Sequence, residues 1–211
     1  MREKEPTTCV IYVRHGKTDF PTDRIYCDDR EDPPLNAAGI EQARAAAKLL
    51  GAQQPIDMIY TSPSCRTRMT ADEIAEVVRA PIIEDQNLRE RRFGVWDGLY
   101  FDDIARDYPD AYQLWRQDPV YYTPEGGETI EGLLGRVTAA VEGKIRDNQR
   151  KTILVVSHVG PIRVCLTKAM NIPIDYYRQL RVDYGALSRV DYGAQQNNLV
   201  YANMTKLLFD F

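Results

Sequence analysis

Histidine is scarce in this sequence, with only two among 211 residues. The spacings His-x-His and His-Glu-x-x-His, which place two ligands on one metal ion, do not occur. A catalytic metal site needs at least three converging protein ligands. A metal-dependent hydrolase is therefore disfavoured, and we expect neither a metal site nor a cofactor.

Cysteine is also scarce, and no Cys-x-x-Cys pair is present. Two of the four cysteines, Cys9 and Cys165, lie in apolar segments, as buried free thiols commonly do, and the others are Cys27 and Cys65. Disulfides are rare in the cytosol, so we expect reduced thiols and a cytoplasmic protein.

Long apolar runs and an excess of basic residues are missing as well. No stretch of about 18 apolar residues occurs, and the segment 1–8 lacks the apolar region of a secretory signal, so we expect no membrane partner. The net charge of −4 argues against nucleic acid as the main partner. The length and the 44% hydrophobic content suit one globular domain over residues 1–211.

What the sequence does contain is two short apolar runs that each end at a histidine. Residues 9–13 lead into His15, and residues 153–156 lead into His158. Such runs are typical of strands buried on both faces of a parallel sheet, and ligands collect beyond the carboxyl ends of such strands. If the two strands are neighbours, the two imidazoles share one site.

Further strands and helices alternate along the chain. Asn36 is a suitable N-cap for a helix that ends near Gly51, and Ser62 with Pro63 suits the start of the next helix. The periodicity predicts strands at 56–61 and 81–84, helices at about 36–51, 62–79, 129–146 and 161–170, and a hairpin of strands 186–190 and 199–204. This alternation predicts an α/β fold with a largely parallel sheet.

Residues from about 98 to 150 interrupt the alternation. They are rich in aromatic residues and contain two short helical patterns, around 100–107 and 110–117. We expect this segment to form a small helical cap insertion over the site. The apolar stripe of the long helix 129–146 indicates core packing rather than a cofactor site.

Arg14 and Arg66 would lie near the two histidines, because Arg14 precedes His15 and Arg66 follows the strand at 56–61. Two guanidinium groups suit the oxygens of a phosphate monoester. A neutral imidazole can attack phosphorus, and a second, protonated imidazole can stabilise the charge on the oxygens. A carboxylic acid is then needed to protonate the leaving alkoxide.

Glu90 is a candidate for that acid, but its neighbours allow a second interpretation. It lies beside Arg89, Arg91 and Arg92, so it could equally belong to a surface cluster of ion pairs. The residues alone leave both interpretations open.

Six sequence segments resemble motifs of the histidine phosphatase superfamily, also called phosphoglycerate mutase-like, in the same order along nearly the whole chain. They are Val13-Arg14-His15-Gly16-x-Thr18, Pro34-Leu35-Asn36-x-x-Gly39-x-x-Gln42-Ala43, Ile59-Tyr60-Thr61-Ser62-Pro63-x-x-Arg66-x-x-x-Thr70-Ala71, Leu88-x-Glu90-x-x-Phe93-Gly94-x-Trp96-x-Gly98, and the pair Gly126-Gly127-Glu128-Thr129 and Val155-Val156-Ser157-His158. The first motif alone is weak evidence, whereas the ordered set is specific.

The resemblance implies a fold and a set of roles. The fold would be a three-layer sandwich, a mostly parallel sheet with helices on both faces. His15 would be the nucleophile that becomes phosphohistidine, Arg14, Arg66 and His158 would hold the phosphoryl group, and Glu90 would be the proton donor.

The sequence departs from the family pattern at three places: Lys17 where many relatives have Glu, Pro21 where many have a phosphate-binding Asn, and Val159 where many have Gly. Thr18 or Thr22 could replace that Asn as a phosphate ligand, or a backbone N–H group could. We expect the contacts to the substrate to be among Arg91, Arg92, Tyr108, Trp115 and Arg116.

Three functions remain open from the sequence. A metal-independent phosphatase acting on a small phosphorylated metabolite is favoured by the length, because mutases of the family tend to be longer. A phosphoglycerate mutase-type transferase is the alternative, and an inactive relative that binds a phosphorylated ligand is the third. The family also makes a homodimer plausible.

Overall fold

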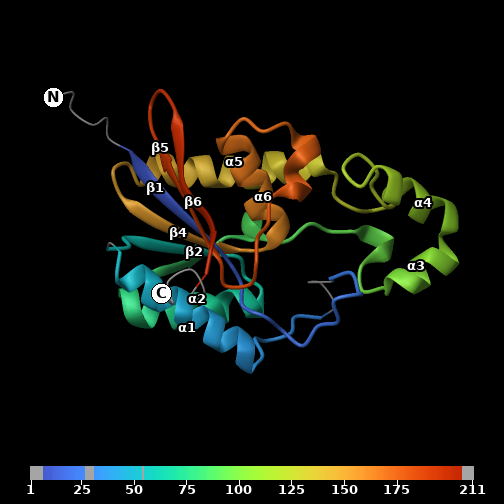
Figure 1. Ribbon diagram of the computed structural model, residues 1–211, viewed down its shortest axis with the longest axis horizontal. Coiled ribbons are helices and arrows are strands. Elements are labelled where there is room, and N and C mark those ends of the chain that lie inside the picture. The colour runs from blue at the N-terminus through green and yellow to red at the C-terminus, as the bar shows by residue number, and fades with distance from the viewer. Residues whose placement is uncertain (1–6, 27–30, 54, 206–211) are drawn as a thin grey trace.

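A mixed six-stranded sheet forms the centre of the part of the chain that the computed structural model describes, residues 7–26, 31–53 and 55–205 (Figure 1). Its strands lie in the order β3-β2-β4-β1-β5-β6. Their bounds are Thr8–Arg14 (β1), Met58–Thr61 (β2), Ile82–Glu84 (β3), Thr152–Ser157 (β4), Leu187–Tyr192 (β5) and Asn197–Met204 (β6). Strands β1 to β4 are parallel, and β5 and β6 join them as the expected antiparallel hairpin.

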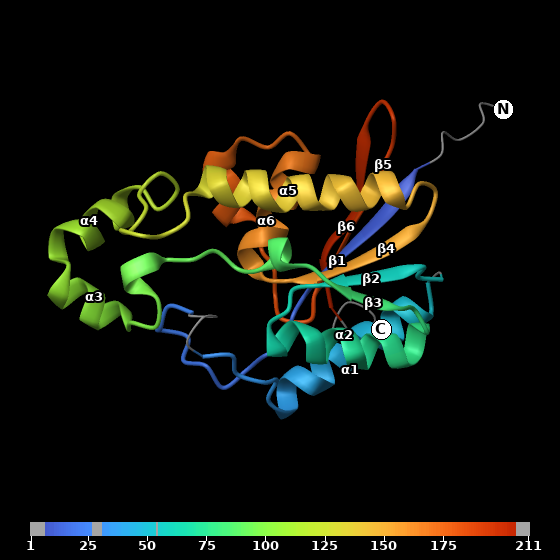
Figure 2. The same cartoon turned by 180° about the vertical axis from the view of Figure 1, so that it is seen from behind.

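Helices cover both faces of this sheet, which confirms the three-layer α/β sandwich. Helices α1 (Ala37–Gly51) and α2 (Cys65–Val78) lie on one face, and α5 (Ile130–Asp147) and α6 (Val159–Ala169) lie on the other (Figure 2). In the described ranges, no helix has both the length and the apolar character needed to cross a membrane.

The unbroken apolar run of β1 follows from its central position. Val10 and Tyr12 point to the side of α5 and α6, whereas Ile11 and Val13 point to the side of α1 and α2. Successive side chains of a strand alternate between the faces of a sheet, so a strand covered on both faces is apolar throughout. Strand β4 is built in the same way and pairs with β1 in parallel, as the shared site requires.

The start of α1 agrees with the prediction, but the start of α2 does not. The side chain of Asn36 accepts a hydrogen bond from the Gly39 amide at 2.9 Å. Helix α2 begins at Cys65 rather than after a Ser62 cap, because the Ser62 amide still donates to the Val156 carbonyl of β4 at 3.1 Å. The hydrogen bonding between the two neighbouring chain segments therefore continues one residue past the end of β2.

Helices α3 (Phe101–Asp107) and α4 (Pro109–Gln117) extend away from the sheet, at the positions expected for the short helices of the cap (Figure 1). They pack on a small apolar cluster of their own that contains Ile25, Trp96 and Ile104. The predicted range of the cap, 98–150, extends too far toward the C-terminus. Helix α5 is not part of the cap, because it packs on the sheet with its predicted apolar stripe buried.

Two glycines allow α1 to approach the loop that follows His15. A Cβ atom added to Gly39 would overlap the carbonyl oxygen of Lys17, and one added to Gly16 would overlap the carbonyl oxygen of Gly39. Both obstacles are backbone atoms, which cannot move aside as the end of a flexible side chain can. The close packing at this position fixes the start of the loop beside the site.

We therefore expect Gly39→Ala to lower the free energy of unfolding by about 1–3 kcal/mol, because overpacking forces the backbone apart. Gly135→Ala in α5 is the matched control, since nothing lies within 4 Å of its added Cβ atom. This control should raise the free energy of unfolding by about 0.5–1 kcal/mol through helix propensity alone. Urea denaturation measures both changes, and a Gly39→Ala variant as stable as the wild type would contradict the close packing.

Candidate active site

The carboxyl ends of three neighbouring strands meet at the site. Strand β1 ends beside His15, β4 ends beside His158, and β2 ends beside Ser62. The His15 amide donates to the Ser157 carbonyl at 3.0 Å, and the two imidazole centroids are 5.2 Å apart. The parallel pairing of β1 and β4 thus brings both histidines together, as expected.

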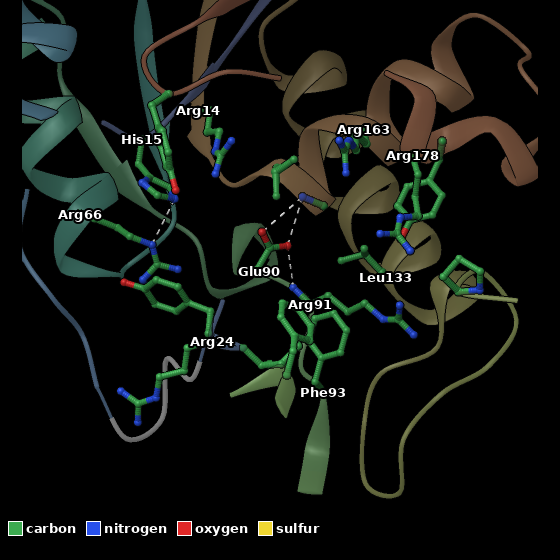
Figure 3. A pocket seen from close by; sticks show the side chains of 18 of the residues that line it. Arg14, His15, Arg24, Arg66, Glu90, Arg91, Phe93, Leu133, Arg163 and Arg178 are labelled. Atoms are coloured by element: carbon green, nitrogen blue, oxygen red, sulfur yellow. Dashed lines mark hydrogen bonds between the residues drawn. The ribbon is translucent and has the colours of Figure 1, made fainter. Parts of the chain in front are cut away.

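The His15 ring is held in one tautomer. Its Nδ1 lies 2.8 Å from the Gly16 carbonyl oxygen, which only accepts, so Nδ1 carries the proton. The lone pair is therefore on Nε2, which accepts a hydrogen bond from Arg66 Nε at 3.3 Å (Figure 3). Burial, with help from the charges of Arg66 and Arg14, lowers the pKa of His15 well below its ordinary value. His15 is thus a neutral imidazole with an available lone pair.

His158 is neutral too, which corrects the expectation of a protonated second imidazole. Its Nδ1 accepts a hydrogen bond from Arg66 Nη2 at 2.9 Å, because a guanidinium group can only donate. Its Nε2 then donates to Ser62 Oγ at 2.9 Å. Burial and the charge of Arg66 lower the pKa of His158 well below its ordinary value. In this arrangement His158 orients Arg66, and His158 itself does not line the pocket, in contrast to the expectation that it holds the phosphoryl group.

The two arginines expected to bind phosphate each lie flat against a tyrosine. The guanidinium carbon of Arg66 is 3.7 Å from the ring centroid of Tyr26, and that of Arg14 is 3.7 Å from the ring centroid of Tyr184. Arg14 Nη1 also donates to the Val182 carbonyl at 2.7 Å. These contacts fix the planes of two donor-rich groups beside the imidazoles. Sequence reasoning missed both tyrosines, which lie in loops and belong to no recognisable motif.

Arg14 has one buried donor group without an acceptor among the described residues. Its Nε is buried and has no hydrogen-bond partner among the described residues. Burial lowers the pKa of Arg14 from its ordinary value, although the group stays charged at neutral pH. A buried donor without an acceptor costs free energy, which an anion in the pocket would recover.

Glu90 lies inside the same pocket and not in a surface ion-pair cluster. Its carboxyl group accepts hydrogen bonds from the Arg91 amide at 2.9 Å and from the Gly160 amide at 3.2 Å (Figure 3). Burial raises the pKa of Glu90, while these two amides and the charges of Arg66 and Arg14 oppose the rise. Glu90 therefore holds a proton to higher pH than an exposed carboxyl group does.

Three of the other predicted site residues differ in their placement. Arg91 lines the pocket, but its Nε donates to the Glu128 carbonyl at 2.8 Å and so also holds the chain in place. Arg92 is exposed and does not line the pocket. Thr18 does not line it either, because its hydroxyl group accepts a hydrogen bond from the Phe20 amide at 3.3 Å.

The pocket itself has a volume of about 270 Å³ and a strongly cationic lining. Its lining includes six arginines, namely Arg14, Arg24, Arg66, Arg91, Arg163 and Arg178. Glu90 is the one carboxylate that lines it among the described residues. In the same ranges, no group of three or more His, Cys, Asp or Glu side chains is placed to hold a metal ion. The pocket therefore suits a small anionic molecule.

A neutral imidazole with an accessible lone pair, two oriented guanidinium groups and a carboxylic acid are the groups needed for phosphoryl transfer through a phosphohistidine. On this α/β sandwich they define a phosphoryl-transfer class of protein. The family model of the histidine phosphatase superfamily (branch 1) matches residues 10–205, so the chain belongs to this family.

Known relatives agree with this assignment. The chain is 28% identical over 203 residues to phosphoserine phosphatase 1 of Hydrogenobacter thermophilus, covering 96% of this chain and 95% of that protein. It is 35% identical over 164 residues to the bifunctional protein Rv2228c of Mycobacterium tuberculosis, covering 78% of this chain but only 44% of that longer protein.

A solved structure shows the same fold. The crystal structure of a putative alpha-ribazole-5'-P phosphatase from Escherichia coli matches with a TM-score of 0.83 and 26% identity, over 93% of this chain and 96% of that chain.

Proposed function

We propose that this protein is a metal-independent phosphomonoesterase that hydrolyses a small phosphorylated metabolite through a phosphohistidine at His15. The observation that carries the proposal is the His15 Nε2 lone pair, which lies in one pocket with Arg14, Arg66 and Glu90. Membership of the family and similarity to a phosphoserine phosphatase support hydrolysis as the reaction.

The first half of the reaction would form a bond between His15 Nε2 and phosphorus. The bond between phosphorus and the leaving oxygen breaks in line with the attack, and Glu90 gives its proton to that oxygen. In the structure Arg66 Nε donates to His15 Nε2. A phosphoryl oxygen is a stronger acceptor, because its hydrogen bond to the guanidinium group is charge-assisted, and it would replace Nε2 as the acceptor. Arg14 Nε would gain its missing partner from the same group.

The second half would return His15 to its starting state. Glu90, now a carboxylate, takes a proton from water as the water oxygen attacks phosphorus. The bond between phosphorus and Nε2 breaks, and inorganic phosphate leaves. Glu90 is protonated again and ready for the next ester.

The remaining expectations stay predictions. Cys9, Cys65 and Cys165 form no disulfide within the described residues, which is compatible with a cytoplasmic location, and Cys27 lies outside those residues. A small phosphate ester rather than nucleic acid is supported as the partner, because the arginines gather inside a pocket of small volume. Homodimer formation is a prediction from the family alone.

The experiment that tests the function is phosphate release from a panel of phosphate monoesters, with a chelator present. His15→Ala should lower the rate by more than about a thousandfold, because loss of a nucleophile removes the covalent route. Substantial release by the variant would contradict the mechanism. Isomerisation of phosphoglycerate without phosphate release would instead assign the mutase reaction.

Gly160→Ala should impair Glu90 without unfolding the protein. The added Cβ atom would overlap Glu90 Oε1, the end of a flexible side chain, so the carboxyl group moves while the backbone stays. We expect kcat/KM for an alkyl phosphate to fall by about 10- to 100-fold, because general-acid catalysis contributes at least this much. Hydrolysis of p-nitrophenyl phosphate should fall less, since its leaving group needs no proton. Equal losses for both esters would contradict the role of Glu90.

The pH profile should be limited by His15 on its acid side and by Glu90 on its alkaline side. The raised pKa of Glu90 keeps the proton donor active above about pH 4.3, the ordinary value for Glu, and activity declines as pH rises through that raised pKa. The lowered pKa of His15 keeps its lone pair available well below about pH 6.5.

Profiles of kcat/KM for wild type and Glu90→Gln with one alkyl phosphate measure this effect, because the titration of the ester itself is common to both. The decline assigned to Glu90 should vanish in the variant, and its persistence would assign that decline to another group.

A further inference from the structure

One peptide group, the one that joins Gly16 to Lys17, lies against the His15 ring. Its carbonyl oxygen, that of Gly16, accepts the hydrogen bond from His15 Nδ1 at 2.8 Å. Its N–H group, that of Lys17, donates to Gln42 Oε1 at 2.9 Å. Gln42 belongs to α1 and takes no part in the reaction described above. The side-chain amide, the peptide group and the imidazole thus form one chain of hydrogen bonds.

The packing of α1 brings Gln42 to this peptide group. Gly39 lies so close to Lys17 that a Cβ atom added to Gly39 would overlap the Lys17 carbonyl oxygen. Gln42 follows Gly39 by three residues, so it lies on the same face of the helix. On the opposite side, a Cβ atom added to Gly185 would be 2.9 Å from the Cβ atom of Gln42. The stem of Gln42 is therefore held between two backbone segments.

The peptide group occupies a position that a carboxylate takes in many hydrolases. A histidine that attacks through Nε2 needs its proton on Nδ1, because a proton on Nε2 would remove the attacking lone pair. In the Ser-His-Asp arrangement, a carboxylate fixes this choice by accepting the Nδ1 hydrogen bond. Among the described residues, no carboxylate is hydrogen-bonded to His15, and the uncharged Gly16 carbonyl accepts from Nδ1 instead.

Two contacts fix the His15 tautomer in the structure, and the reaction would keep only one of them. Arg66 Nε donates to His15 Nε2, which favours a lone pair at that nitrogen. During the reaction a phosphoryl oxygen would replace Nε2 as the acceptor. The Gly16 carbonyl would then be the remaining group that keeps the proton on Nδ1. It would also stabilise the positive charge that develops on the imidazole as the bond to phosphorus forms.

Gln42 strengthens this carbonyl through the other side of the same peptide group. Hydrogen bonds in a chain polarise one another, so an acceptor at the N–H makes the carbonyl oxygen a better acceptor. The bond from Lys17 N–H to Gln42 Oε1 also opposes rotation of the peptide plane. Both effects act on the nitrogen of His15 that faces away from phosphorus.

We propose that Gln42 is a positioning residue of phosphoryl transfer, because it holds the peptide group that keeps the His15 proton on Nδ1 and the lone pair on Nε2. The role in the reaction rests on the proposed function, whereas the chain of hydrogen bonds does not. Gln42 does not line the pocket. It should therefore influence the attack by His15 and leave the binding of phosphate unchanged.

Gln42→Met and Gln42→Glu form a matched pair that tests the role in the reaction. Methionine is similar in size but has no oxygen, whereas glutamate keeps an oxygen at the same place. Gln42→Met should lower kcat/KM for p-nitrophenyl phosphate by about three- to tenfold, the usual effect of one hydrogen bond, with an unchanged inhibition constant for inorganic phosphate. Gln42→Glu should keep most of the wild-type rate. An unchanged kcat/KM in Gln42→Met, or an equal loss in Gln42→Glu, would overturn the role.

Gln53→Met is the control variant, because it removes the same kind of hydrogen bond at the other end of α1. Gln53 Oε1 accepts from the Tyr201 hydroxyl group at 3.0 Å, and Gln53 does not line the pocket. This variant should leave kcat/KM unchanged. A loss equal to that of Gln42→Met would assign both losses to a loosened helix and would contradict the positioning role.

Nitrogen-15 NMR of the histidine rings tests the chain of hydrogen bonds without turnover. The sequence has only two histidines, so the signals that disappear in His15→Ala identify both rings. With inorganic phosphate added to saturation, the wild type should carry the proton on Nδ1 of His15 and on Nε2 of His158. In Gln42→Met the two nitrogen signals of His15 should move toward each other, because both tautomers become populated, and those of His158 should stay in place.

The two measurements separate this inference from the proposed function. Unchanged His15 signals in Gln42→Met would overturn the positioning role even if the protein is an active phosphatase. The expected movement of these signals in a protein that releases no phosphate would support the hold of Gln42 on His15 and would contradict only the proposed function.

Discussion

The parallel pairing of β1 with β4 is the constraint on which the site depends. The pairing sets Arg14 opposite Ser157, so the residue that follows each strand, His15 or His158, reaches the same edge of the sheet. Because both strands are buried on both faces, a change of register would move apolar side chains out of two cores at once. The spacing of the two imidazoles is thus fixed by the packing of the whole sandwich.

Charge then determines what the imidazoles can do. Arg66 is fully buried between them and donates to both rings, which keeps both neutral. Tyr26 and Tyr184 pack against the flat faces of Arg66 and Arg14, which fixes the planes of the two guanidinium groups. In the same cationic surroundings, burial is strong enough to raise the pKa of Glu90. One pocket therefore holds imidazoles that stay unprotonated to lower pH than usual and a carboxyl group that keeps its proton to higher pH than usual.

Much of this arrangement could be predicted from the sequence, because its parts are local. An apolar run that ends at a histidine predicts both the strand and the place of the side chain, and the ordered motifs single out Arg66 and Glu90. The start of α2 was predicted wrongly, since Ser62 and Pro63 look like a cap while the pairing with β4, a contact across the sheet, decides the outcome.

The sequence alone could not identify the residues that reach the pocket only through tertiary contacts. Tyr26, Tyr184 and Arg178 come from loops or short turns, and only the fold brings them to the pocket. Thr18 stands at a plausible distance along the chain, but its hydroxyl group turns to the Phe20 amide. The C-terminal limit of the cap could not be predicted either, because it depends on the packing of α5 against the sheet.

The central claim is that His15 takes the phosphoryl group before water does, and the stereochemistry at phosphorus tests it most directly. The substrate is a phosphate monoester whose phosphoryl group is made chiral with three oxygen isotopes, and the protein transfers that phosphoryl group to an added alcohol acceptor. Two in-line displacements, first by His15 and then by the acceptor, predict overall retention of configuration. Inversion would show a single direct displacement and would contradict the phosphohistidine account.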